Sequence, residues 1–435
     1  MLKTRLFGSS GIRRIADDQL VKIAFEAGLA VGARYRNVVI GGDTRTSTDI
    51  IKAALFSGIQ ASGNICQDAG LLPTPTLAYV ARHFNAGLMV TASHNPPEYN
   101  GIKFWNPDGA AFDDTQERQV EASIESTDIP ADVGHDSATA PQCGGAIDEH
   151  IDRILRDFPG SLRGLKVVVD CGGGAASVTT PKLMKQLGID PILVYCRPSG
   201  VFPRASEPTD ENLAELKRKV VESGAQVGLA HDGDADRLVV VNENGQVISG
   251  DKLMVILAHR LNAKEVVTTV DASMVIEESG LIARRTRVGD SAVSAELKRT
   301  GAQFGGEPCG AWIFPKVSYC PDGIYAAALV STLAAEGSLA KLAGEIPSYP
   351  MIRGSLSFET PPHIDDLEPG LLALDHVDIE RIDGLRLRLK NGWVLIRLSG
   401  TEPKLRLTVE ADSWNGAVEI FEKAKQSIKA VMPCG

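Results

Sequence analysis

The sequence predicts an α/β protein: three similar mixed-sheet α/β domains followed by a C-terminal α+β domain. Short apolar strands recur along the chain, and each is followed by a Gly- or Asp-rich loop and an amphipathic helix. The strands are continuously apolar, which is typical of sheets covered by helices on both faces. With 435 residues, of which 43% are hydrophobic, the chain can bury several cores, so disorder is excluded for most of it.

The strand-and-loop unit divides the first four fifths of the chain into predicted domains at 1–140, 141–248 and 249–350. Strands are expected at Val38–Ile40, Leu88–Val90, Val167–Val169, Val227–Ala230 and Val266–Val270. A turn at Asn242–Gly245 precedes a new helix from about Gly250. The segment Ser126–Gly145 is rich in Asp, Ala, Pro and Gly, and Pro347–Gly370 is rich in proline. Both are poorly periodic, so both are expected to be linkers.

A different pattern begins in the last predicted domain, 351–435. Leu385, Leu387 and Leu389 alternate with polar residues, and Asn391-Gly392 is a strong hairpin turn before a return strand to Leu398. A helix should follow, with Ser413 at its N-cap. This alternation predicts a small α+β unit.

Charge and composition exclude several classes of protein. A net charge of −10 disfavours a broad nucleic-acid surface. No apolar run reaches the roughly 18–20 residues of a membrane-spanning helix. The start Met1–Arg5 lacks a secretory apolar core, and the seven cysteines are scattered. We therefore expect a cytoplasmic protein that binds neither nucleic acid nor membrane. We expect it to be a monomer or a homodimer, which these observations do not distinguish.

Ser93 lies in the segment Thr91–Pro97, directly after an apolar strand. A hydroxyl at the end of a buried strand can act as a nucleophile or carry a phosphate. Lys103 and His94 are nearby cations that would offset phosphate charge. The alternative is a polar turn in which Ser93 bonds its own backbone. The Gly-x-Ser-x-Gly elbow of serine hydrolases does not occur here.

Three carboxylates at alternate positions, Asp232, Asp234 and Asp236, follow another apolar strand. Such crowding is unfavourable unless a cation joins them, and all-oxygen ligation suits Mg²⁺. The calcium helix-loop-helix motif is excluded because its sixth position is Arg237 and a strand, Leu238–Val241, follows too soon. The alternative is a solvated acidic turn.

The loop after Leu398 has the composition of a phosphate cradle. Arg397 and Lys404 supply cations, Ser399 and Thr401 supply hydroxyls, and Gly400 permits close backbone approach. A basic hairpin turn is the alternative.

Two further loops are ambiguous on their own. Glu307, held between glycines, can accept hydrogen bonds from sugar hydroxyls, although a structural loop is favoured. Cys309 beside it is expected to be an inert buried thiol. The segment Gly8–Arg14 either forms a plain turn or presents Arg13 to a phosphate. Gly172–Gly174 begins like a dinucleotide fingerprint, but the third glycine position is Ser177, which favours a tight turn instead.

Taken in order, these motifs resemble the α-D-phosphohexomutase superfamily of phosphoglucomutases, phosphomannomutases and phosphoglucosamine mutases. The matching phrases are Gly-Ser-Ser-Gly-Ile-Arg, Thr-Ala-Ser-His-Asn-Pro, Asp-Gly-Asp-Ala-Asp-Arg, Gly-Glu-Pro-Cys-Gly and Arg-Leu-Ser-Gly-Thr-Glu-Pro-Lys. They span nearly the whole chain, and five in sequence are highly specific. The resemblance implies four domains around a central cleft, and the overall style resembles archaeal sequences assigned as phosphoglucosamine mutases.

The resemblance also implies a role for each motif. Ser93 would be a phosphoserine, and its phosphate would join Asp232, Asp234 and Asp236 around Mg²⁺. The residues around the reacting phosphoryl group would be Arg13, His94, Lys103 and Arg237, with Lys103 the first candidate for acid or base. Glu307 and Cys309 would face the sugar. The distal phosphate would be held by Arg397, Ser399, Gly400, Thr401 and Lys404.

One loop departs from the family pattern. Many members have Glu-Ser-Gly-His where this chain has Glu307-Pro308-Cys309-Gly310-Ala311, so the usual sugar contacts do not carry over directly. The expected activity is interconversion of hexose 6-phosphate and 1-phosphate, with glucosamine as the sugar and a bisphosphorylated sugar as intermediate and activator. The alternatives are a glucose or mannose mutase with this mechanism, a metal-dependent sugar phosphatase, and a non-catalytic binder of phosphosugars.

Overall fold

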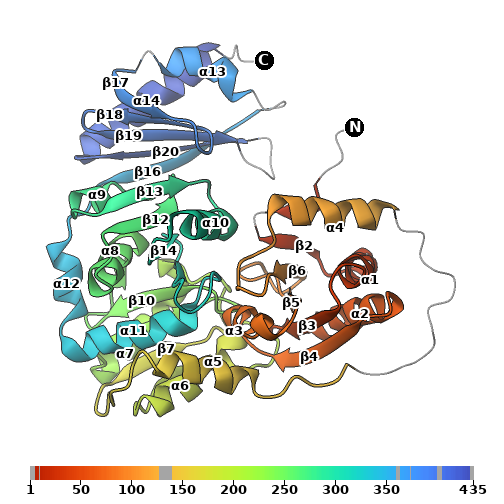
Figure 1. Ribbon diagram of the computed structural model, residues 1–435. Coiled ribbons are helices and arrows are strands. Elements are labelled where there is room, and N and C mark those ends of the chain that lie inside the picture. The colour runs from red at the N-terminus through yellow and green to blue at the C-terminus, as the bar shows by residue number, and fades with distance from the viewer. Residues whose placement is uncertain are drawn as a thin grey trace.

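Four β-sheets follow one another along the chain (Figure 1). The computed structural model describes residues 5–8, 10–126, 140–358, 363–372, 374–398 and 404–431. The first three sheets mix parallel and antiparallel pairs, and the fourth is wholly antiparallel. The predicted fold class is confirmed, while the positions of the domain boundaries stay predictions.

The first sheet has strand order β1-β2-β6-β5-β3-β4. Side chains alternate between its faces: Val38 and Ile40 pack with α1, α2 and α4, whereas Val39 and Met89 pack with α3. The sheet is therefore covered on both sides, as its apolar strands predict. Its elements are β1 (Phe7–Gly8), β2 (Gly11–Ile15), α1 (Asp18–Gly32), β3 (Asn37–Gly42), α2 (Thr48–Ala61), β4 (Ile65–Leu71), α3 (Thr74–Val80), η1 (Ala81–His83), β5 (Ala86–Val90), β6 (Tyr99–Trp105) and α4 (Asp114–Ser126).

The second sheet has strand order β11-β10-β9-β7-β8. Val168 faces α7, and its neighbours Val167 and Val169 face the opposite cluster with α6. The turn at Gly172–Gly174 leads into a short 3₁₀ helix, not into a long α-helix of the dinucleotide-binding kind. The elements are α5 (Ala146–Leu155), β7 (Val167–Asp170), η2 (Ala175–Val178), α6 (Thr180–Gln186), β8 (Ile192–Val194), η3 (Asp210–Leu213), α7 (Ala214–Ser223), β9 (Val227–His231), β10 (Leu238–Asn242) and β11 (Val247–Ile248).

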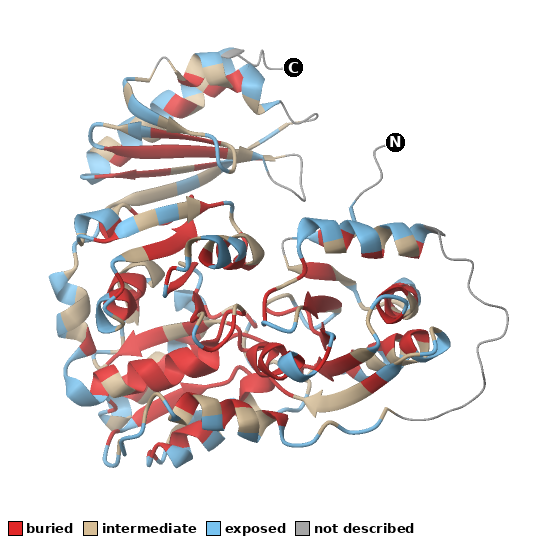
Figure 2. Cartoon of the chain, in the orientation of Figure 1, coloured by how far each residue is buried: buried red, intermediate tan, exposed pale blue. Residues whose placement is uncertain are grey.

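The third sheet, ordered β13-β12-β14-β15, shares one continuous apolar core with the second. Helix α11 lies in this core and is almost wholly buried (Figure 2). The elements are α8 (Gly250–Arg260), β12 (Glu265–Thr269), α9 (Val275–Glu278), β13 (Ile282–Thr286), α10 (Asp290–Thr300), β14 (Gly305–Glu307), β15 (Ala311–Ile313), α11 (Gly323–Glu336) and α12 (Leu339–Glu345).

The fourth sheet, ordered β16-β20-β19-β18-β17, carries two helices on one face. Val394 and Ile396 pack against those helices, whereas Trp393 and Leu395 face the third sheet and contact Val270. The elements are β16 (Met351–Ser357), α13 (Ile364–Leu371), β17 (His376–Glu380), β18 (Leu385–Leu389), β19 (Gly392–Leu398), β20 (Lys404–Ala411) and α14 (Trp414–Val431).

The expected linker at 347–370 is largely wrong. Residues 351–357 form β16, which pairs along its whole length with β20, and Ile364–Leu371 form α13. Leu367 and Leu371, one turn apart, supply the buried face of that helix despite Pro369 in its last turn. Of the other expected linker, residues 127–139 lie outside the described residues.

Among the described helices, none alone has the length and apolarity to cross a membrane. Only α11 and α12 taken together meet that test, and they are bent by 94° at the break between them.

Candidate active site

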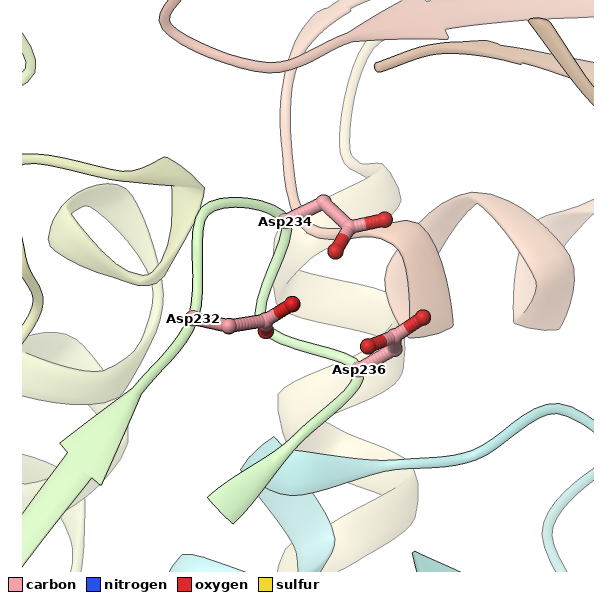
Figure 3. Close-up of side chains that lie close together, drawn as sticks. All are labelled: Asp232, Asp234 and Asp236. Carbon is pink, nitrogen blue, oxygen red and sulfur yellow. The ribbon is translucent and has the colours of Figure 1, made fainter. Parts of the chain in front are cut away.

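The three aspartates of the second sheet lie together in the loop between β9 and β10. Their side chains lie close to one another (Figure 3). One carboxylate oxygen from each of Asp232, Asp234 and Asp236 can be chosen so that all three lie within 4.8 Å of one another, and all three residues are buried. The loop turns sharply because Ala235 adopts a positive φ of 60°. The alternate spacing therefore brings the carboxylates to one point, which excludes the solvated acidic turn.

The donor set fits a hard divalent cation. Among the described residues, Asp234 Oδ1 and Asp236 Oδ1 are buried oxygens without a hydrogen-bond partner. Buried acceptors are rarely left in this state, and carboxylate oxygens are the ligands that Mg²⁺ prefers. The aspartate cluster could therefore hold a divalent cation.

Lys103 from β6 partly offsets the negative charge. Its Nζ lies 2.7 Å from Asp234 Oδ2 and 2.5 Å from Asp236 Oδ2. Burial would lower the pKa of Lys103, but attraction to these two carboxylates outweighs it and raises the pKa. Burial and repulsion from Asp236 and Asp234 raise the pKa of Asp232. Lys103 is thus a charged neighbour of the carboxylates, and its role as acid or base stays a prediction.

Ser93 lies beside the aspartate cluster, three residues beyond the end of β5. Its Oγ donates a 2.7 Å hydrogen bond to Asp232 Oδ2 and lies 3.4 Å from His94 Nδ1. The side chain is almost wholly buried and the backbone φ is 50°, an unusual value for a residue with a Cβ. The alternative of a simple polar turn is therefore excluded, because the hydroxyl binds a residue of the second sheet.

Half-buried cations surround this centre. Arg13 Nη1 lies 3.5 Å from Asn95 Oδ1 in the serine loop, residues 91–99. The backbone N–H of Arg237 donates to Asp232 Oδ1 at 3.3 Å. Burial lowers the pKa of His94 to about 3, and the positive charges of Arg237, Arg13 and Lys103 lower it further. The structure thus brings Arg13, His94, Lys103 and Arg237 around Ser93 and the aspartates.

Glu307 approaches the centre from the third sheet. Its Oε2 accepts a 3.0 Å hydrogen bond from the N–H of Gly289, and burial together with repulsion from Asp290 raises its pKa to about 7. A β-bridge between Arg237 and Ala311 joins the hairpin of Glu307 to the aspartate loop, residues 232–237 between β9 and β10.

Cys309 is exposed, so the prediction of a buried thiol is wrong. Glu307 pairs with Ala311 across the hairpin, which leaves Cys309 at the tip of the turn.

The predicted phosphate cradle is described only in part. Ser399, Gly400 and Thr401 lie outside the described residues. Arg397, near the end of β19, forms an ion pair with Asp383 in which Nη2 and Oδ2 are 2.8 Å apart. Asp383 also accepts a 3.0 Å hydrogen bond from the N–H of Val288, which links the fourth sheet to the third. Lys404 begins β20.

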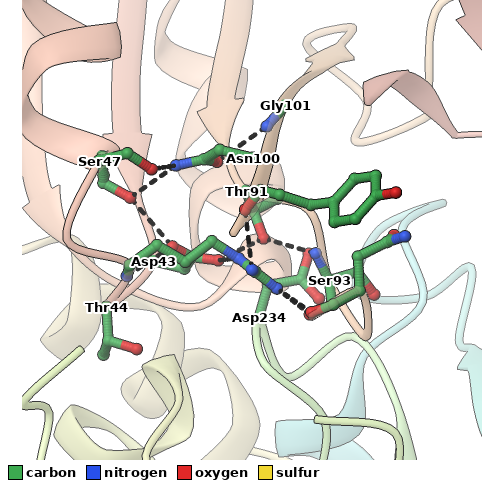
Figure 4. Close-up of polar contacts among 12 residues, drawn as sticks. Asp43, Thr44, Ser47, Thr91, Ser93, Asn100, Gly101 and Asp234 are labelled. Carbon is green, nitrogen blue, oxygen red and sulfur yellow. Dashed lines mark hydrogen bonds and ion pairs between the residues drawn. The ribbon is translucent and has the colours of Figure 1, made fainter. Parts of the chain in front are cut away.

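Three residues of the site were not predicted from the sequence. Thr74, at the start of α3, donates from its Oγ1 to Asp234 Oδ2 at 2.5 Å and from its N–H to the Asp234 carbonyl at 2.9 Å. Asp43 and Arg45 form a buried ion pair behind Ser93, and Figure 4 shows Asp43 linked to Thr91. Gly41-Gly42-Asp43 is recognisable as a strand-end loop, but no sequence signal marks Arg45 or Thr74.

Comparison with known proteins identifies the family to which this chain is similar. Four family models match in order, all described as phosphoglucomutase/phosphomannomutase: α/β/α domain I at 4–130, domain II at 148–245, domain III at 249–349 and the C-terminal domain at 361–424. Two relatives named probable phosphoglucosamine mutase are each 44% identical: one from Methanocella arvoryzae, over 98% of both chains, and one from Methanosarcina barkeri, over 98% of this chain and 100% of the relative.

A solved structure agrees with these matches. A phosphoglucomutase/phosphomannomutase family protein from Burkholderia thailandensis superposes with a TM-score of 0.88 at 28% identity, covering 100% of this chain and 99% of that one. The chain therefore belongs to the phosphoglucomutase/phosphomannomutase family and is a phosphohexomutase.

Proposed function

We propose that this phosphohexomutase interconverts glucosamine 6-phosphate and glucosamine 1-phosphate, with Ser93 as the residue that carries the phosphoryl group. The observation that carries the proposal is the 2.7 Å hydrogen bond from Ser93 Oγ to Asp232, which joins a hydroxyl nucleophile to a cation site. The choice of sugar rests on the two relatives named probable phosphoglucosamine mutase.

In the first step a hydroxyl oxygen of the sugar monophosphate attacks the phosphorus on Ser93. A new O–P bond forms, the Ser93 Oγ–P bond breaks, and the hydroxyl proton passes to a base at the site. The bisphosphorylated sugar then turns over and returns its other phosphoryl group to Ser93, so the same molecule also serves as the activator. His94 and Lys103 are the candidates for the base: His94 Nδ1 lies 3.4 Å from Ser93 Oγ, and Lys103 contacts two carboxylates of the aspartate cluster. Those carboxylates raise the pKa of Lys103, so it would have to lose its proton before it could act as a base, whereas the lowered pKa of His94 keeps its ring neutral.

The residues around Ser93 match the charge that moves in this step. Asp232, Asp234 and Asp236 would hold Mg²⁺, with the Ser93 phosphate as a further ligand. When bound, Mg²⁺ neutralises charge on the transferring group. Arg13 and Arg237 add positive charge from the rim.

The sugar and its distal phosphate would be held by the third and fourth sheets. Glu307 offers a carboxylate to sugar hydroxyls, and Cys309 stands exposed at the tip of the same turn. The distal phosphate would be held by Arg397, Ser399, Gly400, Thr401 and Lys404. On binding, the phosphate would have to compete with Asp383 for the guanidinium of Arg397.

The test follows glucosamine 6-phosphate by phosphorus NMR, with Mg²⁺ and a trace of the bisphosphorylated sugar. Glucose and mannose 6-phosphates run in parallel tubes, and the matched control is Ser93→Ala. We expect the 1-phosphate signal to grow with glucosamine 6-phosphate, and Ser93→Ala to lower turnover by several orders of magnitude, since the nucleophile is lost.

Three other results would revise the sugar, the reaction or the role of Ser93. Turnover of glucose or mannose phosphate alone would replace the sugar and keep the mechanism. Release of inorganic phosphate without the 1-phosphate would favour a metal-dependent phosphatase. Near-normal turnover by Ser93→Ala would remove the phosphoserine from the mechanism.

A further inference from the structure

We propose that Arg45 and Asp43 are positioning residues that hold Ser93 in its strained backbone conformation, so that the rate of phosphoryl transfer depends on them while sugar binding does not. This inference rests on the proposed role of Ser93 as phosphoryl carrier.

The serine is held where its own backbone preference would not place it. A φ of 50° puts Ser93 in the left-handed region, which a residue with a Cβ disfavours because the Cβ crowds the neighbouring carbonyl oxygen. Such conformations persist only where the surroundings over-determine them, and they cluster at functional sites. The contacts that maintain this conformation are therefore part of the mechanism.

Arg45 is the centre of those contacts. Its side chain is wholly buried, and its guanidinium donates to four backbone carbonyls of the serine loop. The acceptors are Ser93 O at 2.9 Å, Asn95 O at 2.7 Å, Pro96 O at 2.6 Å and Tyr99 O at 2.9 Å. One planar group thus fixes the course of the loop on both sides of its turn.

Asp43 aligns the arginine and the serine together. Its Oδ2 accepts hydrogen bonds from Arg45 Nε at 3.1 Å and from Thr91 Oγ1 at 2.7 Å. Thr91 Oγ1 in turn accepts the N–H of Ser93 at 2.9 Å (Figure 4). Arg45 therefore holds the carbonyl of Ser93, and Asp43 holds its N–H through Thr91.

The aspartate loop closes the opposite side of the serine. A Cβ on Gly233 would lie 2.4 Å from Ser93 O, the same carbonyl that Arg45 Nη2 holds. A shift of the serine loop would therefore either clash with the aspartate loop or lengthen the Ser93–Asp232 contact. Arg45 itself makes no described side-chain contact with Glu307 or Arg397, which is why we expect sugar binding to be spared.

The experiment compares Arg45→Lys and Asp43→Asn with the wild-type protein and with Arg285→Lys. Arg285 is a matched control: its side chain is 4% exposed, it donates to the carbonyls of Thr269, Ala272 and Ser273, and it pairs with Glu277 in the third sheet. Lysine keeps the charge but lacks the fork that reaches several carbonyls. Steady-state kcat and KM, the thermal midpoint, and the rate of Ser93 phosphorylation by the bisphosphorylated sugar, read by mass spectrometry, are measured for each.

We expect kcat and the phosphorylation rate to fall about 100-fold for Arg45→Lys, since a misplacement of about 1 Å has that effect. KM of Arg45→Lys should stay near the wild-type value. Asp43→Asn should also lower kcat and the phosphorylation rate, and Arg285→Lys should keep the wild-type rates. Guanidinium ion added to Arg45→Ala should restore part of the phosphorylation rate, which a general loss of folding would not allow.

Unchanged kcat in the folded Arg45→Lys and Asp43→Asn proteins would overturn the inference. Equal losses in Arg285→Lys would also overturn it, because the effect would then be a general one of a buried arginine. If Arg45→Lys does not fold, the isosteric Thr91→Val decides: it removes both hydrogen bonds of the Thr91 hydroxyl, and unchanged phosphorylation would reject the proposal. A wild-type protein that is not phosphorylated on Ser93 would reject the proposed function instead.

Discussion

The junction of the first two sheets and the contact between the third and fourth sheets are built differently. At the first junction, buried hydrogen bonds cross between the sheets at several separate points: from Thr74 to Asp234, from Ser93 to Asp232 and from Lys103 to Asp236. Among the described residues, the third and fourth sheets instead meet through a small apolar cluster, a hydrogen bond from the Val288 N–H to Asp383, and one buried carboxylate.

That carboxylate is Glu410, and three donors converge on it. Ser273 Oγ lies 2.5 Å from its Oε1, and the Met274 N–H and Trp393 Nε1 each lie 2.7 Å from its Oε2. The fourth sheet has its own apolar core, whereas the second and third share one. The end of the site where the phosphoryl group would move is thus fixed at many points, and the end that would hold the distal phosphate is attached at few. We expect the fourth domain to move as a unit.

Of the changes that test this comparison, the largest effect is expected from filling the space between the serine and aspartate loops. Gly233→Ala places a Cβ where only 2.4 Å separates it from backbone oxygen, so the two loops must separate. We expect kcat to fall by about 100-fold or more and the thermal stabilisation by Mg²⁺ to shrink. Gly160→Ala is the control, since nothing lies within 4 Å of its Cβ position. Wild-type kcat in Gly233→Ala would show that this junction is not rigid.

An intermediate effect is expected at the attachment of the fourth sheet. Glu410→Ala leaves three buried donors without their acceptor, which should lower the free energy of unfolding by about 1–3 kcal/mol for each unsatisfied group. KM for the phosphosugar should rise more than kcat falls, and Ser93 should still accept phosphate at the wild-type rate. Trp393→Phe, which removes one donor only, should show a smaller change in the same direction. A slower phosphorylation of Ser93 would mean that the two regions are coupled.

The smallest effect is a pH dependence at the same attachment. Burial raises the pKa of Asp251 from its usual 3.8 to about 6, and repulsion from Glu410 also raises it. The hydrogen bond that the Asp251 carboxylate accepts from the Ser273 N–H lowers the pKa only in part. Because the folded-state pKa is the higher one, ionisation disfavours the folded state. The resulting loss in the free energy of unfolding is absent below about pH 4, grows as the pH rises to about 6, and is complete above that value.

Asp251→Asn should remove that cost. We expect its thermal midpoint to exceed that of the wild type at pH 8, and the difference to vanish near pH 4. Thermal scans of both proteins across this range measure it. A difference that is independent of pH would mean that the carboxyl group of Asp251 does not titrate in this way.

The fold class followed from local pattern, and so did much of the site. Continuously apolar strands such as Val167–Val169 mark sheets covered on both faces, and polar loops after strands mark the edge where Ser93 and the aspartates meet. The spacing of Asp232, Asp234 and Asp236 left two interpretations, a cation site and a solvated acidic turn, and the burial of the three residues in the folded molecule favours the first.

Other features have no local signal. The segment 351–357 has little apolar alternation of its own and becomes β16 only because β20, much later in the chain, offers it a pairing edge. Cys309 is exposed because it lies in the turn between Glu307 and Ala311, which pair across the hairpin, and this place depends on the strand pairing.

Residue types and their order thus determined which groups are available: the serine, the three aspartates, the cations and the strands that present them. Only the tertiary structure decided that Arg45, Asp43 and Thr74 serve them. Arg45 donates to backbone carbonyls, which every residue has, so no pattern of side chains in the sequence can predict the contact. Hydrogen bonds between segments distant in the chain are set by how the sheets pack, and that information is present only in the folded molecule.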